Sequence, residues 1–524
     1  MQEKIVPISK AIKSIQDGDT IAINGFVGIG TPEELVIGLE TRFLETGSPS
    51  NVTLTFAAAP GDAGERGLNR LAHKGLVGRA IGGHWSLVPK IATLAVDNEI
   101  EAYNLPLGCI SQLYRAIAAQ RPGMLSRVGV RTFVDPRLEG GRINARTLTD
   151  LVKFIDLEGE EYLFYKTFPI NVCFIRGTTA DPAGNVTMER EAVTLDALPI
   201  AMATRNSGGT VIVQVEQIAE RASLNPRNVQ IPGELVDYIV VASPENHDQT
   251  YATHYSSALA GQIRVPVERI PPLPLDERKI IARRAAMELP DRAIINLGIG
   301  MPEGVASVAA EENVLNHLTL TTESGVIGGF PQGGLDFGSA LNASAVIPQN
   351  QIFDFYEGGG LNLAVLGMAQ VDAKGNVNVS RFNGRLAGAG GFINISQNAR
   401  KIIFCGTFTA GGLKVSTEGE ILTILNEGKS RKFIKAVEQI TFSGDYARHL
   451  EQDVLYVTER CVLSLGPNGM ELIEVAPGID IEKDILAHMD FKPIVHFPRL
   501  MDERLFKTTS LGLARIMKNN EKTR

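Results

Sequence analysis

The chain has few cysteines and few histidines for its length. It contains four cysteines and eight histidines among 524 residues. Cys109, Cys173, Cys405 and Cys461 are not spaced like metal ligands, and the histidines form no metal-spaced pair and no obvious catalytic triad. Cys173 and Cys405 lie in apolar, strand-like runs. We therefore expect buried, reduced thiols and no metal site.

The sequence also lacks a long apolar run and an excess of positive charge. No segment reaches the ~18 consecutive apolar residues that a membrane-spanning helix needs. Near the N-terminus, Lys10 and Lys13 interrupt any apolar stretch, so we expect no signal peptide and a cytoplasmic location. The formal net charge is −8, with acidic and basic residues mixed along the chain. This pattern favours neither a nucleic acid nor a membrane as a partner.

The length and the order of the elements predict two α/β domains. A chain of 524 residues is far longer than the ~250–300 at which a single core stops growing. Strand-like and helix-like segments alternate, which favours largely parallel sheets. Four prolines between residues 266 and 274 indicate an extended linker. We expect an N-terminal domain at 1–265, a linker at 266–275 and a C-terminal domain at 276–524.

Three short motifs occur twice, in the same order in each half. The first copies are GIGTPE at 28–33, VTLT at 52–55 and DPAGNV at 181–186, and the second are GIGMPE at 298–303, LTLT at 318–321 and DAKGNV at 372–377. Three echoes in one order predict that the halves are copies of one α/β unit, fused in a single chain. The first copy carries an insertion between its second and third motif.

Glu323 is the strongest candidate for a catalytic residue. It follows the strand-like run 318–321 and precedes the glycine-rich segment 324–329, so it lies where a strand opens into a loop. In the first copy the matching position is Ala57, in an apolar run. A carboxylate needs only to be ionised and close to an electrophile to act as a nucleophile. This pattern indicates acyl transfer by carboxylate attack.

Three other glycine-rich segments could approach a ligand closely. Residues 387–391 could direct main-chain N–H groups at an oxyanion, and residues 356–360 form a second candidate. Gly298 and Gly300 partly match a dinucleotide-binding fingerprint, with Glu323 at about the ~20-residue spacing of a ribose-binding acid. Pro302 removes an N–H that a pyrophosphate would use. A nucleotide-dependent oxidoreductase thus stays open as an alternative.

Taken together, the motifs resemble those of family I CoA-transferases, of the acetate or propionate (short-chain acyl-CoA:acetate) type. The segment TTESGVIGG at 321–329 is similar to the motif that carries the catalytic glutamate of that family. The resemblance covers almost the whole chain. The further segments that carry it are GGHW at 82–85, YNLP at 103–106, TFVDPR at 132–137, FYEGGG at 355–360, GGFI at 390–393 and YVTER at 456–460.

The resemblance implies ping-pong transfer of CoA between a short-chain acyl-CoA and a free acid, through a thioester on Glu323. It implies no metal or redox cofactor beyond the substrate CoA, and a homotetramer. The implied site residues are Gly390 and Gly391 at the oxyanion, Gly298, Ile299, Gly300 and Gly388 at CoA, and Gly28, Leu107, Tyr356, Glu357 and Gly358 at the substrate pocket.

Position 107 departs from the family pattern. The family usually has Pro-Gln-Gly where this chain has Pro106-Leu107-Gly108. In relatives that act on ketoacids, the resemblance implies that this glutamine polarises the reacting carbonyl. Leucine has no hydrogen-bond donor. Either another donor replaces it or the substrate is less polar. A 3-oxoacid CoA-transferase and a catalytically silent acyl-CoA sensor therefore remain alternatives.

Overall fold

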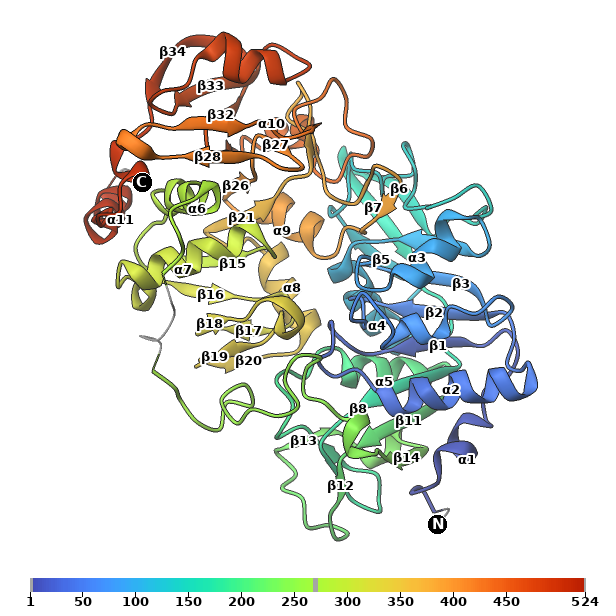
Figure 1. Ribbon diagram of the computed structural model, residues 1–524. Coiled ribbons are helices and arrows are strands. Elements are labelled where there is room, and N and C mark those ends of the chain that lie inside the picture. The colour runs from blue at the N-terminus through green and yellow to red at the C-terminus, as the bar shows by residue number, and fades with distance from the viewer. Residues whose placement is uncertain (1–2, 267–271, 523–524) are drawn as a thin grey trace.

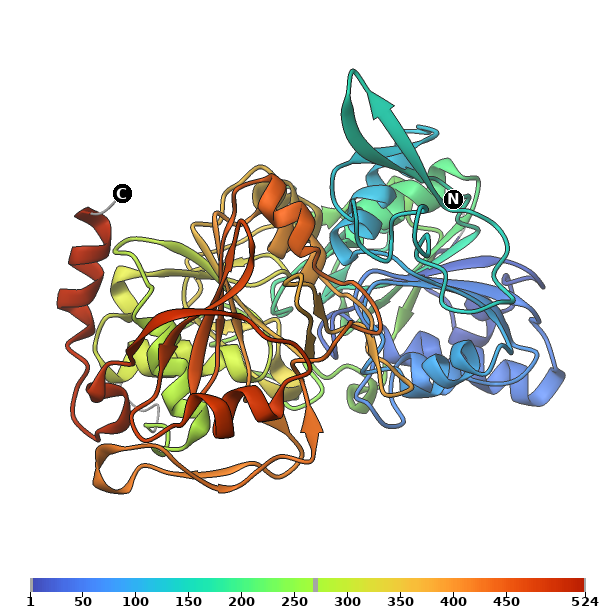
Figure 2. The ribbon, with the colours of Figure 1, turned by 90° about the horizontal axis from the view of Figure 1, so that it is seen from above.

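The computed structural model describes residues 3–266 and 272–522. Figure 1 shows two α/β halves, the first in blue to green and the second in yellow to red, and Figure 2 shows them side by side from above. Two fused α/β units with mainly parallel sheets are thus confirmed. The domain boundaries remain a prediction, and residues 267–271 of the expected linker lie outside the described residues.

The first half is built on a seven-stranded parallel sheet in the order β14-β11-β8-β1-β2-β3-β4. Most side chains of its central strands are buried, as expected of a parallel sheet that is covered on both faces. The strands are β1 (Thr20–Ile23), β2 (Val52–Phe56), β3 (Val77–Gly82), β4 (Glu101–Asn104), β8 (Val172–Arg176), β11 (Thr210–Val215) and β14 (Tyr238–Val241), and the helices are α1 (Ile8–Ile12), α2 (Glu33–Thr46), α3 (Pro89–Val96), α4 (Leu107–Ala118) and α5 (Ala197–Asn206).

The predicted insertion in the first half corresponds to added structure between β2 and β8. It contains β3, β4, α3 and α4, and a separate antiparallel sheet in the order β5-β7-β6. The bounds of these three strands are Gly123–Ser126, Glu160–Lys166 and Val152–Leu157. The insertion matters for function because α4 packs on α8 and α9 of the second half (Figure 1).

The second half has a ten-stranded sheet in the order β20-β17-β16-β15-β21-β26-β31-β32-β33-β34. Its centre, from β16 to β31, is parallel, whereas β17, β20, β32 and β33 add antiparallel pairs on both sides. The strands are β15 (Ile294–Leu297), β16 (Thr319–Thr321), β17 (Val326–Ile327), β20 (Ala345–Val346), β21 (Leu363–Gly367), β26 (Lys401–Cys405), β31 (Asp453–Val457), β32 (Cys461–Gly466), β33 (Gly469–Val475) and β34 (Ile494–Leu500), and the helices are α6 (Glu277–Ala286), α7 (Gly304–Glu311), α8 (Gln349–Glu357), α9 (Phe392–Asn398), α10 (Gly444–His449) and α11 (Leu513–Lys522).

Strand register supports the repeat. β1 pairs in parallel with β2 so that Ala22 lies opposite Thr55, and β15 pairs with β16 so that Asn296 lies opposite Thr321. In each half the first strand also pairs in parallel with the strand on its other side, β8 or β21. The structure therefore places Ala57 and Glu323 at equivalent strand ends.

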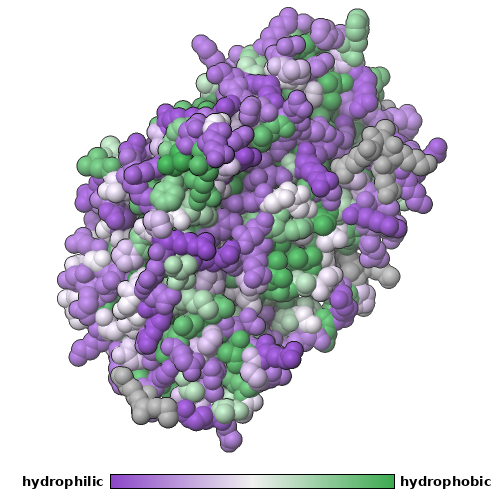
Figure 3. All heavy atoms as spheres, turned by 180° about the vertical axis from the view of Figure 1, so that it is seen from behind, coloured by the Kyte–Doolittle hydropathy of each residue, from purple (hydrophilic) through white to green (hydrophobic). Residues whose placement is uncertain are grey.

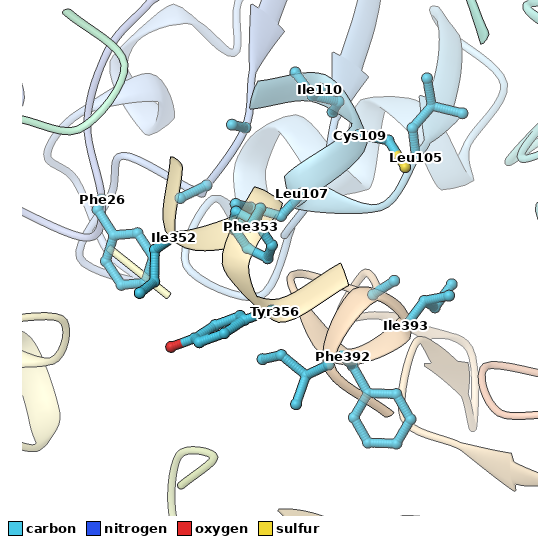
Figure 4. Packing of buried hydrophobic residues seen from close by; sticks show 14 of the residues in the cluster. Phe26, Leu105, Leu107, Cys109, Ile110, Ile352, Phe353, Tyr356, Phe392 and Ile393 are labelled. Carbon is cyan, nitrogen blue, oxygen red and sulfur yellow. The ribbon is translucent and has the colours of Figure 1, made fainter. Parts of the chain in front are cut away.

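The two halves share a buried apolar cluster where α4 packs on α8 and α9 (Figure 4). Gly108 makes this contact possible, because a Cβ atom there would lie 2.5 Å from the ring of Phe353. Phe353 and Leu107 are almost completely buried. Burial of a large apolar side chain contributes roughly 1.5–3 kcal/mol. The cluster therefore helps to fix the position of one half against the other.

No helix of the described residues is long and apolar enough to cross a membrane. On the face in Figure 3, hydrophilic and hydrophobic side chains are interleaved.

Candidate active site

Glu323 lies in a tight turn directly after β16. The N–H of Gly325 donates to the carbonyl of Thr322 at 3.1 Å, and the hydroxyls of Thr322 and Ser324 lie 2.7 Å apart. Gly325 has φ +113°, and a Cβ atom there would lie 2.0 Å from the carbonyl oxygen of Ile347. Only glycine fits such a position. Gly325, two residues after Glu323, therefore fixes the turn that directs the carboxylate into the site.

The Glu323 side chain faces a cavity of about 310 Å³ between the two halves. Of the residues expected in the site, Glu323, Leu107, Gly298, Ile299, Gly388, Gly390 and Gly391 line this cavity. The structure thus brings the segments predicted for catalysis, for the oxyanion and for CoA together around one cavity, whereas their roles remain predictions. Most of the remaining lining is apolar, and includes Phe26, Val27, Ala58, Ala59, Phe337, Leu366, Phe382 and Phe392.

The main-chain N–H of Gly391 donates a hydrogen bond to the Glu323 carboxylate. A Cβ atom at position 391 would lie 1.8 Å from Glu323 Oε2, so a side chain there would displace the carboxylate. Gly391 immediately precedes α9, and its N–H belongs to the first turn, where N–H groups have no partner within the helix. This donor is therefore available to an oxyanion that forms at the same place.

Burial raises the pKa of Glu323 to about 7, and the hydrogen bond from Gly391 opposes that rise. A carboxylate in such a setting is poorly solvated, so its ionised form is more reactive than an exposed glutamate. At neutral pH a large fraction is still ionised. The site thus combines an ionisable nucleophile with poor solvation of its charged form.

The first half holds the glycine loop that carries this donor. The N–H of Gly390 donates to the carbonyl of Gly83 at 2.9 Å, and the carbonyl of Gly390 accepts from the N–H of Leu107, also at 2.9 Å. The N–H of Ala389 donates to Asn104 Oδ1 at 2.9 Å. Every one of these bonds joins the two halves, so the donor is positioned by residues far away in sequence.

Asn104, at the end of β4, is a site residue that the sequence reasoning missed. Its side chain is buried, and Nδ2 donates to the carbonyls of Gly82 at 3.1 Å and Gly83 at 2.6 Å. One amide thus holds both the 82–83 bend and the 388–391 loop. The signal was present, because Asn104 belongs to the segment 103–106 that carries the resemblance, but its contact lies 285 residues away.

Tyr356, Glu357 and Gly358 lie at the end of α8, outside the cavity lining. Tyr356 is buried beneath β16, and its hydroxyl donates to Thr321 Oγ1 at 2.8 Å. Glu357 Oε1 accepts from Asn394 Nδ2 at 2.7 Å, and burial raises the pKa of Glu357 to about 7. These residues support the strand and the helix that carry Glu323 and Gly391.

Gly28 and Gly300 also lie outside the lining. Gly28 packs against Tyr251, whose main-chain nitrogen would lie 2.3 Å from a Cβ atom at position 28. Its neighbours Phe26 and Val27 reach the cavity instead. Gly300 has φ +84° and precedes a short 3-10 turn at Met301–Glu303. Both glycines shape strand-to-helix turns beside the site.

The remaining candidates give no sign of metal chemistry. Within residues 3–266 and 272–522, no cluster of three His, Cys, Asp or Glu side chains could hold a metal ion. Trp85 is fully buried, and its indole N–H donates to the carbonyl of Gly82 at 3.1 Å. Burial and the nearby charge of Arg385 lower the pKa of His84 to about 4, so this cavity-lining histidine is neutral at pH 7.

Two α/β copies with one carboxylate at the end of a strand, facing a main-chain donor, define a CoA-transferase. The chain belongs to the coenzyme A transferase family, whose model matches residues 6–242. It is an enzyme that transfers CoA between an acyl-CoA and an acid, which excludes the oxidoreductase interpretation.

Relatives match over nearly the whole chain. The chain is 46% identical to the caffeate CoA-transferase of Acetobacterium woodii, over 98% of this chain and 99% of the relative. It is 42% identical to the acetate CoA-transferase YdiF of Escherichia coli K12, over 97% and 96%. The crystal structure of YdiF from E. coli O157:H7, solved as a thioester complex with CoA, superposes with a TM-score of 0.92 at 41% identity, covering 98% of this chain and 97% of that one.

Proposed function

We propose that the protein transfers CoA from a short-chain acyl-CoA to a free carboxylate through a thioester on Glu323, with ping-pong kinetics. The observation that carries this proposal is the hydrogen bond from Gly391 to the only carboxylate that lines the cavity among the described residues. The thioester complex of YdiF with CoA, a relative at 41% identity, supports it.

In the first half-reaction, a Glu323 carboxylate oxygen attacks the thioester carbon of the acyl-CoA. The C–S bond breaks, CoA leaves as a thiolate, and an acyl-glutamyl anhydride remains. The thiolate then attacks the Glu323 carbonyl carbon of the anhydride, which releases the donor acid as a carboxylate and forms glutamyl-CoA. An acceptor carboxylate reverses both steps, so atoms and electrons balance without a redox cofactor.

Each tetrahedral intermediate carries a negatively charged oxygen that needs a donor. In the predicted oxyanion segment Gly390–Gly391, Gly391 is the proposed donor, because the N–H of Gly390 is held by the carbonyl of Gly83. The loss of one such donor typically costs ~10²–10³ in rate. Gly298, Ile299, Gly300 and Gly388 are proposed to contact CoA. Binding energy from the long CoA arm can then hold the thioester in attack geometry.

The acid is proposed to be small, such as acetate or propionate. YdiF, an acetate CoA-transferase at 42% identity, supports this choice. A second candidate is a bulkier, aromatic acid. The caffeate CoA-transferase at 46% identity favours it, and so do Leu107, Phe26 and Phe337 in the cavity wall. A 3-oxoacid is disfavoured, because Leu107 offers no donor to a second carbonyl.

The proposal includes a cytoplasmic homotetramer that needs no metal or redox group. CoA is the substrate of the family, and the covalent glutamyl-CoA is the proposed intermediate.

Two experiments test this function. Incubation with acetyl-CoA and labelled acetate should move label into acetyl-CoA with no other acid present, whereas a silent sensor would bind CoA without exchange. A panel of acetate, propionate, butyrate, acetoacetate and caffeate as acceptors should then rank the acids. If caffeate exceeds acetate in kcat/KM, the aromatic alternative replaces the short-chain one.

A further inference from the structure

A second cavity lies in the first half, at the carboxyl ends of β8, β11 and β14. We call it the polar cavity. Arg176 is the last residue of β8, and Glu216 and Ala242 directly follow β11 and β14. The volume is about 90 Å³, and among the described residues none that lines this space also lines the cavity around Glu323. The carboxyl edge of a parallel sheet is where ligands bind in many α/β proteins.

The repeat relates the polar cavity to the cavity around Glu323. The strand registers align Arg176 of β8 with Gly367 of β21. Glu191 and Phe382 follow the third repeated motif at the same distance in their two halves. Gly367 and Phe382 line the cavity around Glu323, whereas Arg176 and Glu191 line the polar cavity. Both halves therefore have a cavity at the same place in the repeat, and in the first half a buried ion pair replaces a glycine and a phenylalanine.

Two buried side chains of the polar cavity each have a polar atom that lacks a hydrogen-bond partner in the described part of the chain. These atoms are Glu191 Oε2 and His247 Nε2. The two side chains are only 2% and 5% exposed. The other carboxylate oxygen, Glu191 Oε1, accepts from Arg176 Nε at 2.9 Å. Because buried polar atoms in folded proteins are nearly always paired, the two atoms indicate a molecule bound in the cavity.

The surrounding hydrogen bonds show that His247 Nε2 is a donor. Gln214 Oε1 accepts from the N–H of Glu34 at 2.9 Å, and Gln214 Nε2 donates to the carbonyl of Asn246 at 2.9 Å, which fixes the orientation of the amide. The second hydrogen of Gln214 Nε2 is then directed at His247 Nδ1, 3.1 Å away. Burial and the charge of Arg176 lower the pKa of His247, so the ring is neutral at pH 7. Since Nδ1 accepts, the one ring hydrogen is on Nε2.

The carboxylate of Glu191 is an acceptor, and both arginines of the polar cavity are paired. Burial would raise the pKa of Glu191, but the Arg176 guanidinium lowers it to about 2, so Oε2 carries no hydrogen at pH 7. Arg190 Nε donates to Glu216 Oε2 at 2.9 Å. An anion would therefore compete with a glutamate at each arginine. The polar cavity offers one unpaired N–H donor and one unpaired carboxylate oxygen.

We propose that the polar cavity binds a small uncharged molecule through a hydroxyl or a primary amide group. Such a group donates to Glu191 Oε2 and accepts from the N–H of His247 Nε2. A carboxylate has no hydrogen to donate, and an ammonium group has no lone pair to offer, so each would leave one of the two atoms unpaired. One water takes ~30 Å³ of the liquid, so the cavity has room for more than a single water. This binding is separate from the transfer of CoA at Glu323.

The test compares four probes of similar size on the whole chain: propionamide, 1-propanol, propionate and propylammonium. NMR titration gives the Kd of each probe, and crystals soaked in each probe give its position. Propionamide or 1-propanol should lie between Glu191 and His247, and the tighter of the two identifies the amide or the hydroxyl as the preferred group. Propionate and propylammonium should be absent from the polar cavity.

Two variants and a matched control tie the Kd to this cavity. His247→Asn keeps an acceptor for Gln214 but removes the Nε2 donor, so it should weaken binding by about 10-fold. Ala242→Leu places a larger side chain in the cavity from a half-buried position and should abolish binding. Ala310→Leu, at a half-buried position of α7 outside both cavities, should leave the Kd unchanged. All three should keep CoA transfer within about twofold of the wild type, which shows that they fold.

Three results would overturn the proposal. The first is that crystals soaked in propionamide and in 1-propanol show only ordered water in the polar cavity. The second is that wild type, His247→Asn and Ala242→Leu bind the uncharged probes with the same Kd. The third is that propionate or propylammonium occupies the polar cavity more tightly than both uncharged probes.

Discussion

The two halves place the same strands in the same register but end them with different chemistry. After β2 the chain continues with Ala57, Ala58 and Ala59, which are all buried. After β16 it continues with Thr322, Glu323 and Ser324, and the carboxylate faces the cavity. The comparison teaches that one copy supplies the reactive group and the other shapes its surroundings.

The first half therefore also contributes to the site. Ala58 and Ala59 line the cavity, and Gly83, Asn104 and Leu107 hold the loop that carries Gly391. Small side chains at the end of β2 leave room for the substrate, which a second carboxylate would fill. The reaction needs both halves because the nucleophile and the groups that position its donor come from different copies.

The largest loss of activity should come from removing the carboxylate at the end of β16, and moving it to the end of β2 should not restore activity. Glu323→Ala should lower CoA transfer by ~10⁴-fold or more, because the nucleophile is lost. The double variant Ala57→Glu/Glu323→Ala should stay inactive, because the Gly391 donor faces position 323 only. Label exchange between acetyl-CoA and acetate measures both, and circular dichroism checks the fold. Recovery of activity in the double variant would mean that the halves are interchangeable.

The next effect should come from Asn104, the contribution of the first half. Asn104→Ala should lower kcat by ~10²–10³-fold, as expected for a displaced oxyanion donor, with a smaller change in KM. Asn144→Ala is the matched control. Its Nδ2 also donates to two carbonyls, of Ala95 at 2.6 Å and Ile100 at 2.9 Å, away from the cavity. An equal loss of kcat in both variants would mean that Asn104 only stabilises the fold and does not position the Gly391 donor.

The third prediction concerns the pH dependence of kcat/KM, which we assign to Glu323 in the second half. Attack requires an ionised Glu323, and burial raises its pKa to about 7. For the free enzyme, kcat/KM for acyl-CoA should rise with pH, with a midpoint near 7, and fall about tenfold per pH unit below it. Glu357 has a similar pKa but does not line the cavity. Glu357→Gln should therefore leave the midpoint of the kcat/KM profile unchanged. A midpoint near 4.5, or one that disappears in Glu357→Gln, would contradict the assignment.

The smallest effect concerns stability. Because the folded state raises the pKa of Glu323, it binds the proton more tightly than the unfolded chain does, and ionisation costs stability. This cost is absent below the unfolded value of about 4.5, grows as pH rises to about 7, and is constant above it. Glu323→Gln should therefore raise Tm by a few degrees at pH 8 and change it little at pH 4. A lower Tm of Glu323→Gln than of the wild type at pH 8 would show that burial of the ionised carboxylate does not destabilise the folded protein.

Much of the fold and of the candidate site was predictable because it depends on short sequence patterns. Alternating Leu and Thr, one carboxylate and then glycines predicted the end of β16, and the repeated motifs predicted two copies. The glycine loop near residue 390 was predicted from its composition. Leu107 was recognised as a departure at a position that the structure places in the cavity wall.

The remaining parts could not be predicted because they depend on how the halves meet. Asn104 contacts Ala389 across 285 positions, and no periodicity encodes that contact. The glycines at 358–360 indicated a close approach to the ligand, but they follow α8, whose last residues support β16 and α9 from below.

The most direct test of the account is mass spectrometry of the wild-type protein after incubation with acetyl-CoA and no acceptor acid. We expect a covalent CoA adduct on the peptide that contains Glu323, which disappears when acetate is added and is absent from Glu323→Ala. Label exchange without any adduct, or an adduct on another residue, would contradict the central role of Glu323.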